Sequence, residues 1–404
     1  MGAGHSHGGS SQLVVPSQLT RWLTAVAAVI GLVAVIGMVV LWPSGDLQSS
    51  ITNVSSTFVD GRIVAAEEVP CPGQQAEGAP QLLCAELDVE VLEGADAGLL
   101  VPLDVYDAAS ADLSVGDVIV LEYDEASPAG FQYRFSDRER STPMVALVVL
   151  FAVVVVLLGR WRGLAALVGL GMSLGVLLVF TVPALIEGSD PLSVALVSAT
   201  VIAFAGVYLA HGFNSMSTVA LLGTLGALAI TALLALVFVG AAAITGLASE
   251  EAVYLQLGPV RLGLAGLVLA GIVIGALGAI DDMTVTQASA VWELRATGGR
   301  TSPMALYRSG IRIGRDHVAS TVNTLVLAYA GASMPLLLFF SLSNQSWLVV
   351  ANGELVATEI VRTLVGSIGL VASVPLTTAL AAWVAHRAED PGGDDHHHVE
   401  EPDA

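Results

Sequence analysis

Two adjacent carboxylates, Asp281 and Asp282, follow directly on a long apolar stretch of the chain. If a helix continues through them, Asp282, Thr286, Ser289 and Glu293 fall at i, i+4, i+7 and i+11 and share one face. A stripe of acceptors and hydroxyls can line the path of a cation or a proton, and it can equally be the wet face of a helix lying along the membrane. Ionisable groups are costly in lipid and often functional, so we weigh transport or proton relay against a structural cap or loop role. The candidates for transport or relay are Asp281, Asp282, Thr286, Gln287, Glu293 and Asn323.

A basic segment follows the acidic one. Arg308, Arg312 and Arg315 recur there at helical spacing. One interpretation is a helix on the inner membrane surface, held by anionic headgroups at about 1 kcal/mol per Arg. A sharper interpretation makes these three arginines gating partners of the acidic candidates. The next apolar stretch opens with the polar cluster 320–324, which contains Asn323 and must find partners among neighbouring helices.

The elements that position these residues are helices in a lipid environment. Of the 404 residues, 54% are hydrophobic and 13% are charged, and the mean hydropathy is +0.76. A span needs about 20 apolar residues to cross the hydrocarbon, and eight windows qualify. They are 22–42, 142–159, 163–186, 192–210, 218–246, 262–280, 321–342 and 361–384. Small residues within them, as in Gly171-xxx-Gly175 and Gly271-xxx-Gly275, favour close helix packing.

The placement of arginine in short loops predicts the orientation of these spans. With the first residue inside, the inner loops hold Arg160 and Arg162, then five arginines between 295 and 315, and finally Arg387. The short outer turns carry acidic residues instead, and Arg261 and Arg362 are exceptions at the outer ends of spans, where a side chain can snorkel. The first window is longer than a signal-peptide core, which indicates an uncleaved signal anchor. We therefore expect both termini to be cytoplasmic.

An acidic region separates the first window from the second. Residues 43–141 hold 19 acidic residues against four arginines, which argues against nucleic acid as a partner. Short alternating runs at 58–64, 82–92, 99–106 and 113–123 predict strands, and about five strands suggest a small OB-like or SH3-like barrel. Cys71 and Cys84 flank a loop in this region, and outside the cytoplasm a disulfide is favoured over free thiols or a zinc site.

The predicted organisation is an α-helical polytopic membrane protein with about eight transmembrane helices and one small β-rich extracytoplasmic domain. Its parts are a cytoplasmic tail (1–21), the anchor (22–42), the β-rich acidic domain (43–141), a seven-helix transmembrane domain (142–387) and an acidic, His-containing cytoplasmic tail (388–404).

The string Gly278-Ala-Ile-Asp-Asp-Met-Thr-Val-Thr-Gln-Ala-Ser-Ala-Val-Trp-Glu-Leu resembles the YibE/F family of bacterial membrane proteins. The Arg/Gly segment, Asp316-His317 and the stretch from Ser320 to Gly331 extend the likeness, which reaches over nearly the whole chain apart from the tails. The resemblance implies a multi-pass protein of the bacterial plasma membrane and carries no established activity with it. The order of anchor, outer domain, Asp-bearing span and Thr-rich span is also similar to SecD/SecF-type, proton-driven export components, as an analogy only.

Common enzyme signatures are absent from the sequence. It contains no GxSxG, HExxH or Walker A motif, and we expect no enzyme activity, no cofactor and no bound metal. The expected partners are the lipid bilayer and either a second copy or another membrane subunit. The leading hypothesis is a secondary transporter or permease-like component. The alternative is a non-catalytic scaffold or accessory subunit that binds a partner through its outer domain, and a membrane enzyme comes third.

Overall fold

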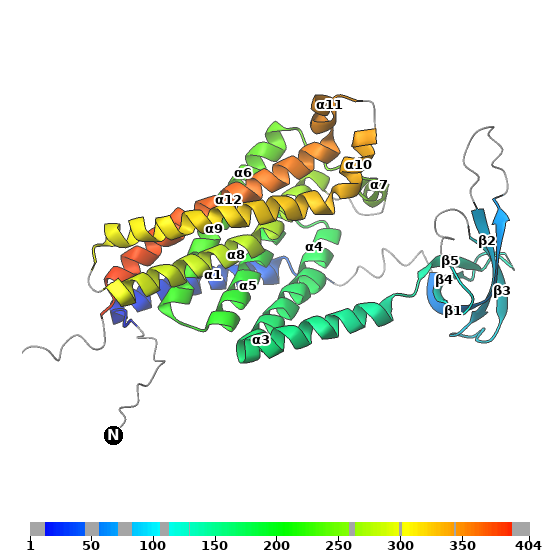
Figure 1. Cartoon of the computed structure of the whole chain (residues 1–404), viewed down its shortest axis with the longest axis horizontal. Helices are drawn as coiled ribbons and strands as arrows, with labels where there is room; N and C mark the ends of the chain where they lie inside the picture. The colour runs from blue at the N-terminus through cyan, green and yellow to red at the C-terminus, as the bar shows by residue number, and fades with distance from the viewer. Residues whose placement is uncertain are drawn as a thin grey trace, which may run out of the picture. The chain divides into compact units, whose positions relative to one another are not determined.

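The computed structural model describes residues 13–44, 56–71, 83–105, 113–128, 130–257, 263–298, 301–342 and 345–389. It divides into two compact units, which Figure 1 shows as a helical bundle and a small β-structure. The helical unit comprises residues 1–47 and 159–404, and the β-unit comprises residues 48–158. Each unit is described by itself.

The helical unit is built from long apolar helices joined by short connections. In chain order the helices are α1 (Ser17–Val40), α3 (Ser141–Gly175), the π-helical η2 (Val176–Thr181), α4 (Val182–Ile186), α5 (Pro191–His211), α6 (Ser215–Ala241), α7 (Glu250–Leu257), α8 (Leu264–Gly298), α9 (Pro303–Ala332), α10 (Met334–Leu342), α11 (Trp347–Asn352) and α12 (Glu354–His386). The first part of α3, up to residue 158, is counted with the β-unit.

Among the described residues, six helices are long and apolar enough to cross a membrane. The number becomes seven if α9 and α10, which are bent by 62° relative to each other, form one span. The sequence predicts eight because it places two windows in the 46-residue run Ser141–Ile186, which is here one helical run broken at Arg160, where φ is 53°. A straight helix of that length would extend about 69 Å, more than twice the hydrocarbon thickness. The count of eight crossings stays a prediction.

Small residues let the central helices α6, α8 and α12 approach closely. A Cβ on Gly223 of α6 would collide with the side chain of Thr377 on α12, and a Cβ on Gly369 of α12 would collide with Thr231 on α6. The buried residues around them are mostly Ala, Val, Leu and Thr. Helices in lipid gain little from hydrophobic association, so this close packing of small side chains holds the bundle together.

Successive long helices run in alternating directions, so the described ends of the chain lie at the same end of the bundle. Val14, just before α1, forms a two-stranded bridge with Glu389, just after α12. The guanidinium of Arg295, near the end of α8, donates to the carbonyl of Ala388 over 2.8 Å. We call this the termini end. The opposite end holds the contact of Ser44 with Glu187 and that of Glu354 with Thr245.

The β-unit is a five-stranded antiparallel sheet in the order β3-β2-β1-β4-β5. Its strands are β1 (Ser56–Pro70), β2 (Leu83–Val91), β3 (Leu100–Val105), β4 (Val118–Asp124) and β5 (Tyr133–Arg138). Strands β3 and β5 come into contact, so the sheet curls into a half-barrel around Ile63, Leu87, Val89, Ile119 and Leu121, where the sequence predicts a small OB-like or SH3-like barrel.

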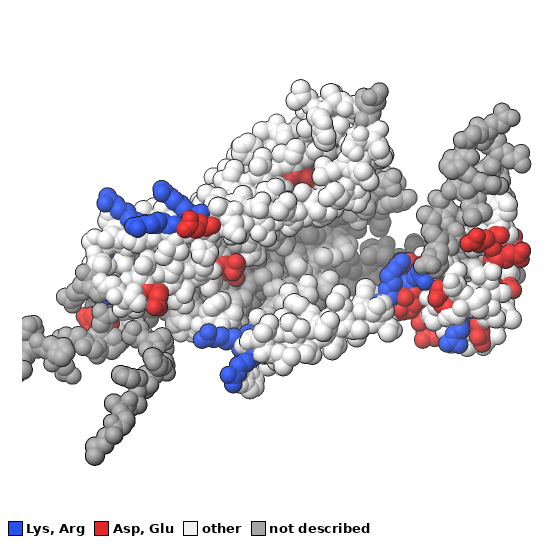
Figure 2. Space-filling view, in the orientation of Figure 1, with Lys and Arg blue, Asp and Glu red and all other residues white. Residues whose placement is uncertain are grey.

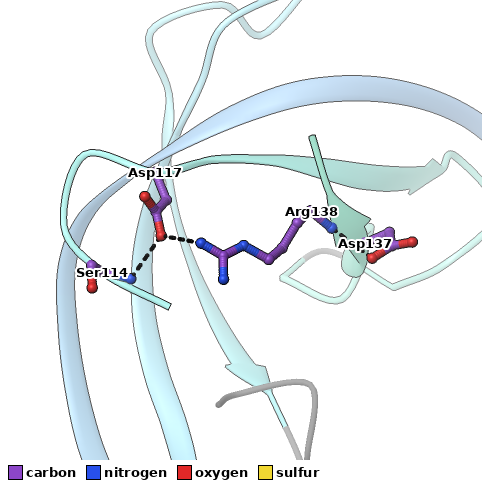
Figure 3. Close-up of polar contacts among 4 residues, drawn as sticks. All are labelled: Ser114, Asp117, Asp137 and Arg138. Atoms are coloured by element: carbon purple, nitrogen blue, oxygen red, sulfur yellow. Dashed lines mark hydrogen bonds and ion pairs between the residues drawn. The ribbon is translucent and has the colours of Figure 1, made fainter. Parts of the chain in front are cut away.

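Two links fasten the half-barrel. The predicted disulfide between Cys71 and Cys84 is confirmed and joins the end of β1 to the start of β2, with the Cα atoms 4.9 Å apart. In Figure 3, the guanidinium of Arg138 on β5 lies 2.9 Å from a carboxylate oxygen of Asp117, which also accepts from the backbone amide of Ser114. Asp137 accepts from the backbone amide of Arg138. The strand before α3 is thus tied to the loop before β4.

Candidate functional site on helix α8

Helix α8 has an exposed face that is unlike the other helices of the bundle. Every exposed residue of α8 is a glycine, a carboxylate or a hydroxyl residue. One face carries seven positions spaced by steps of three or four residues, all exposed except Thr286, which is half-buried. We call these positions the α8 stripe: Gly271, Gly275, Gly278, Asp282, Thr286, Ser289 and Glu293.

The α8 stripe is long enough to cross a bilayer. Its ends are 22 residues apart, or about 33 Å at 1.5 Å per residue, and the hydrocarbon core is about 30 Å thick. The exposed residues of α3, in contrast, include Leu147, Val148, Leu150 and Phe151, as expected for a lipid-facing helix. The predicted face from Asp282 to Glu293 is confirmed as one helical face, and it extends about three turns further in the N-terminal direction through glycines.

The two adjacent acids lie deeper in the bundle than the sequence predicts. The predicted span ends at 280, but α8 is continuous from Leu264 to Gly298, so the pair sits at its midpoint. Asp281 is level with Gly206 on α5 and Thr224 on α6. These residues lie five and nine positions inside their helices, or about 8 and 14 Å from the helix ends. The two acids are therefore well inside the length of the neighbouring helices rather than level with the helix ends.

Asp281 and Asp282 meet different surroundings although they are neighbours. Asp281 is half-buried, and its Oδ1 lies 3.3 Å from the hydroxyl of Thr224. That hydroxyl is also 2.6 Å from the hydroxyl of Thr284, which donates to the backbone carbonyl of Asp281. Asp282 is turned about 100° further around the helix and is exposed on the α8 stripe. Asp281 thus joins α8 to α6, whereas Asp282 faces outward.

Gln287 is a packing residue. Its side chain is 1% exposed, and its amide nitrogen donates to the carbonyl of Gly310 on α9 over 2.7 Å and to the hydroxyl of Thr378 on α12 over 2.8 Å. A Cβ on Gly314 of α9 would lie 2.9 Å from the Gln287 carbonyl oxygen, so glycine is needed for this approach. The amide fixes the junction of α8, α9 and α12 and does not belong to the exposed stripe.

The α8 stripe ends in a cleft of about 960 Å³ at the termini end. Ser289 and Glu293 line it from α8, together with Arg162 from α3, Tyr208 and His211 from α5, and Asn214 before α6. The Tyr208 hydroxyl lies 3.1 Å from that of Thr218, another lining residue. The cleft thus gathers one carboxylate, one guanidinium, one imidazole and several hydroxyls, which can bind a polar solute or an ion.

The predicted gating arginines lie on the outside of α9. Arg308, Arg312 and Arg315 are exposed, and within the described residues none is within ion-pair distance of an acid. Figure 2 shows basic side chains of the helical unit gathered at one end, over α9 and at the bend of α3. The segment that carries them is the beginning of α9 itself and not a separate surface helix. Asn323 is exposed on the same helix. The roles predicted for these residues stay predictions.

Sequence reasoning assigned no site role to three polar residues at the opposite end of the stripe, although it placed Arg362 at the outer end of a span. Tyr329 on α9 and Glu359 and Arg362 on α12 lie there, with the Tyr329 hydroxyl close to Gly275 and the guanidinium of Arg362 close to Gly271. The sequence did contain a signal for this end of the stripe. The helical spacing of the polar face, continued toward the N-terminus from Asp282, falls on Gly278, Gly275 and Gly271.

Metal binding finds no support in the part of the chain that the structure describes. There, no three His, Cys, Asp or Glu side chains come together as a group that could hold an ion. The His-containing ends of the sequence, at 5–7 and 396–398, lie outside the described residues.

Long apolar helices and a core of small residues define a multi-pass membrane protein with a small β half-barrel, and the polar stripe lies on the exposed face of one of its helices. The family model described as YibE/F-like protein matches residues 147–387, which is more than half of the chain. The chain belongs to the YibE/F-like family. The match covers the helices that carry the α8 stripe and leaves out the first helix and the β-unit. No curated protein and no solved structure matches the chain, and the SecD/SecF analogy has no support.

Proposed function

We propose that this protein is a secondary transporter or permease-like component in which the α8 stripe lines a polar path for a cation or a proton. One observation carries the proposal. The exposed face of a helix long enough to span the bilayer holds glycines, hydroxyls and carboxylates over about 33 Å, without one apolar side chain.

Physical cost argues against lipid as the neighbour of this face. An ionised aspartate at the centre of a spanning helix costs about 2.5–3.5 kcal/mol on insertion scales, and such residues line cavities or pair with other groups. Asp282 is exposed at the midpoint of α8. The glycines on the N-terminal side of Asp282 leave room beside the helix, and the hydroxyls on its C-terminal side offer hydrogen-bond acceptors. Both features suit a path that water and a small cation can enter.

The cleft at the termini end supplies an entrance to this path. It contains Ser289 and Glu293 of the stripe, and one arginine, Arg162, lines it. By the positive-inside rule we assign this end to the cytoplasm of a bacterial plasma membrane, which makes both termini cytoplasmic. In this proposal Asp282 and Glu293 are the acidic elements, Asp281 supports the α6–α8 junction, and no covalent chemistry or cofactor is involved.

Flux of protons and small cations into proteoliposomes, with and without a pH gradient, tests the proposal. We expect Asp282→Asn to lower the flux by about tenfold or more, because it removes the charge that stabilises a cation on the path. Asp316→Asn is the matched control, since Asp316 is an exposed acid on α9 outside the stripe, and it should retain the flux. Equal flux in both variants and in empty liposomes would remove the basis of the proposal.

A second candidate function is a membrane scaffold or accessory subunit. It is favoured by α9, on which Ser320, Asn323 and Thr324 are exposed along the outward side of the helix. Polar side chains at membrane depth associate with polar groups on other helices. Cross-linking from a cysteine at Ser320 distinguishes this function, because a partner or a second copy should be captured there, and a protein that stays uncross-linked would argue against it.

A further inference from the structure

The two ends of the α8 stripe differ in how they are covered. At the termini end the stripe opens into the cleft of about 960 Å³. At the other end, side chains from α9 and α12 lie against its glycines, which are themselves still exposed. A Cβ on Gly275 would lie 2.9 Å from the hydroxyl oxygen of Tyr329, and a Cβ on Gly271 would lie 3.9 Å from Nη2 of Arg362. The glycine at 275 therefore leaves room for the Tyr329 hydroxyl, whereas the contact of Arg362 with position 271 is an ordinary van der Waals contact.

The covering side chains form a loose polar group. Nη1 of Arg362 lies 2.9 Å from Oε1 of Glu359, one helical turn earlier on α12, and the two side chains are 30% and 27% exposed. Nε of Arg362 is buried and has no hydrogen-bond partner among the described residues. Rather than extending freely to the membrane surface, this guanidinium is turned into the bundle with its hydrogen bonding incomplete.

We propose that Tyr329, Glu359 and Arg362 form a gate that closes the α8 stripe at the end opposite the cleft. The inference rests on the proposed function and deepens it, because it assigns this structure to one state of an alternating-access cycle, open at the cleft and closed at the gate. The path from the gate to the cleft then contains Gly278, Asp282, Thr286 and Ser289.

The free-energy cost of separating the gate side chains is low, as a gate that must open requires. A partly exposed ion pair contributes only about 0–1 kcal/mol, so its separation has a low cost. A buried guanidinium nitrogen without a partner lowers the cost further, because water entering from the open side can satisfy it. Tyr329 is three residues before the end of α9, where the chain bends by 62° into α10. A change of that bend moves the tyrosine relative to Gly275 without unfolding either helix.

Thiol accessibility at Gly278 tests the gate. A Cβ at Gly278 meets nothing within 4 Å, so Gly278→Cys should be tolerated, and the two native cysteines are paired with each other. A membrane-impermeant thiol reagent is added to the full-length protein in oriented vesicles, once from the cleft side and once from the gate side. We expect modification from the cleft side, and modification from the gate side that rises about tenfold in Arg362→Ala and in Tyr329→Ala.

Controls separate the gate from general damage. Arg387→Ala, at the termini end, should leave the gate-side rate unchanged, and the mild variants Glu359→Gln and Tyr329→Phe replace the alanine variants if these fail to fold. Asp282→Cys is the second reporter.

Two results would overturn the gate. If the cysteine at 278 reacts from the cleft side but no gate variant raises the rate of its modification from the gate side, the proposed gate is wrong. The proposed path along the α8 stripe would not be affected by that result. If neither reporter reacts from either side, the stripe is not a water-accessible path, and the proposed function and the gate are both wrong.

Discussion

At the scale of single residues, the helix rotation of about 100° per residue separates groups that the sequence presents together. Asp281 and Asp282 read as one acidic pair, but one carboxylate accepts from Thr224 and the other is exposed on the α8 stripe. Gln287 falls within the same stretch and is 1% exposed, with a partner 91 residues away in the chain. The sequence could identify these side chains as polar and costly in lipid. It could not assign each to packing or to a path, because that depends on which helices surround α8.

Gln287→Leu is expected to destabilise the protein. The change removes the two hydrogen bonds, to Gly310 and Thr378, that join α8 to α9 and α12, which costs about 1–3 kcal/mol. Thermal unfolding of the purified protein in detergent measures the loss. Thr286→Val is the control, because Thr286 faces the stripe and forms no side-chain hydrogen bond within the described part of the chain, so its effect should stay within about 0.5 kcal/mol. Equal stabilities for the wild type and Gln287→Leu would contradict the packing role.

At the scale of elements, the sequence predicted the long helices and the strands of the β-unit well, because apolar runs and alternation are strong signals. It ended the sixth span at 280, whereas α8 continues to Gly298. The reason is that polar residues lower hydropathy without ending a helix when neighbouring helices cover them. The glycine half of the α8 stripe was not predicted, because glycines in a membrane helix usually indicate helix packing. In the structure, Gly275 leaves room for the hydroxyl of Tyr329.

The close approach of α6 and α12 predicts the effect of single methyl groups. Gly223→Ala and Gly369→Ala each place a methyl against a threonine of the other helix, so each should destabilise the bundle by about 1–3 kcal/mol. Gly240→Ala is the matched control, because a Cβ there meets nothing within 4 Å and alanine favours the helix. Unfolding in a denaturing detergent compares the three variants. A destabilised control together with two unaffected core variants would show that the glycines do not set the packing.

At the scale of the whole molecule, the helices form a bundle with two different ends. The chain's described ends meet at one of them, through the bridge between Val14 and Glu389 and the bond from Arg295 to Ala388. That end has the exposed arginines and the cleft, and the other has Tyr329, Glu359 and Arg362. The arginine pattern of the loops predicted that both termini lie on one side of the bundle. The number of crossings depends on the bend at Arg160, which lies between the two apolar windows 142–159 and 163–186; the hydropathy pattern marks its position but not how far the chain turns there.

The central claim is that the α8 stripe lines a water-accessible path, and a cysteine scan of α8 tests it most directly. Single cysteines are introduced from 271 to 293, and each is treated with a membrane-impermeant thiol reagent from the cleft side, because only thiols in contact with water react rapidly. We predict fast modification at Asp282, Thr286 and Ser289, and protection at buried positions such as Ile280 and Ala288, which gives a helical period. Uniform protection of the stripe, or reactivity without that period, would contradict the account.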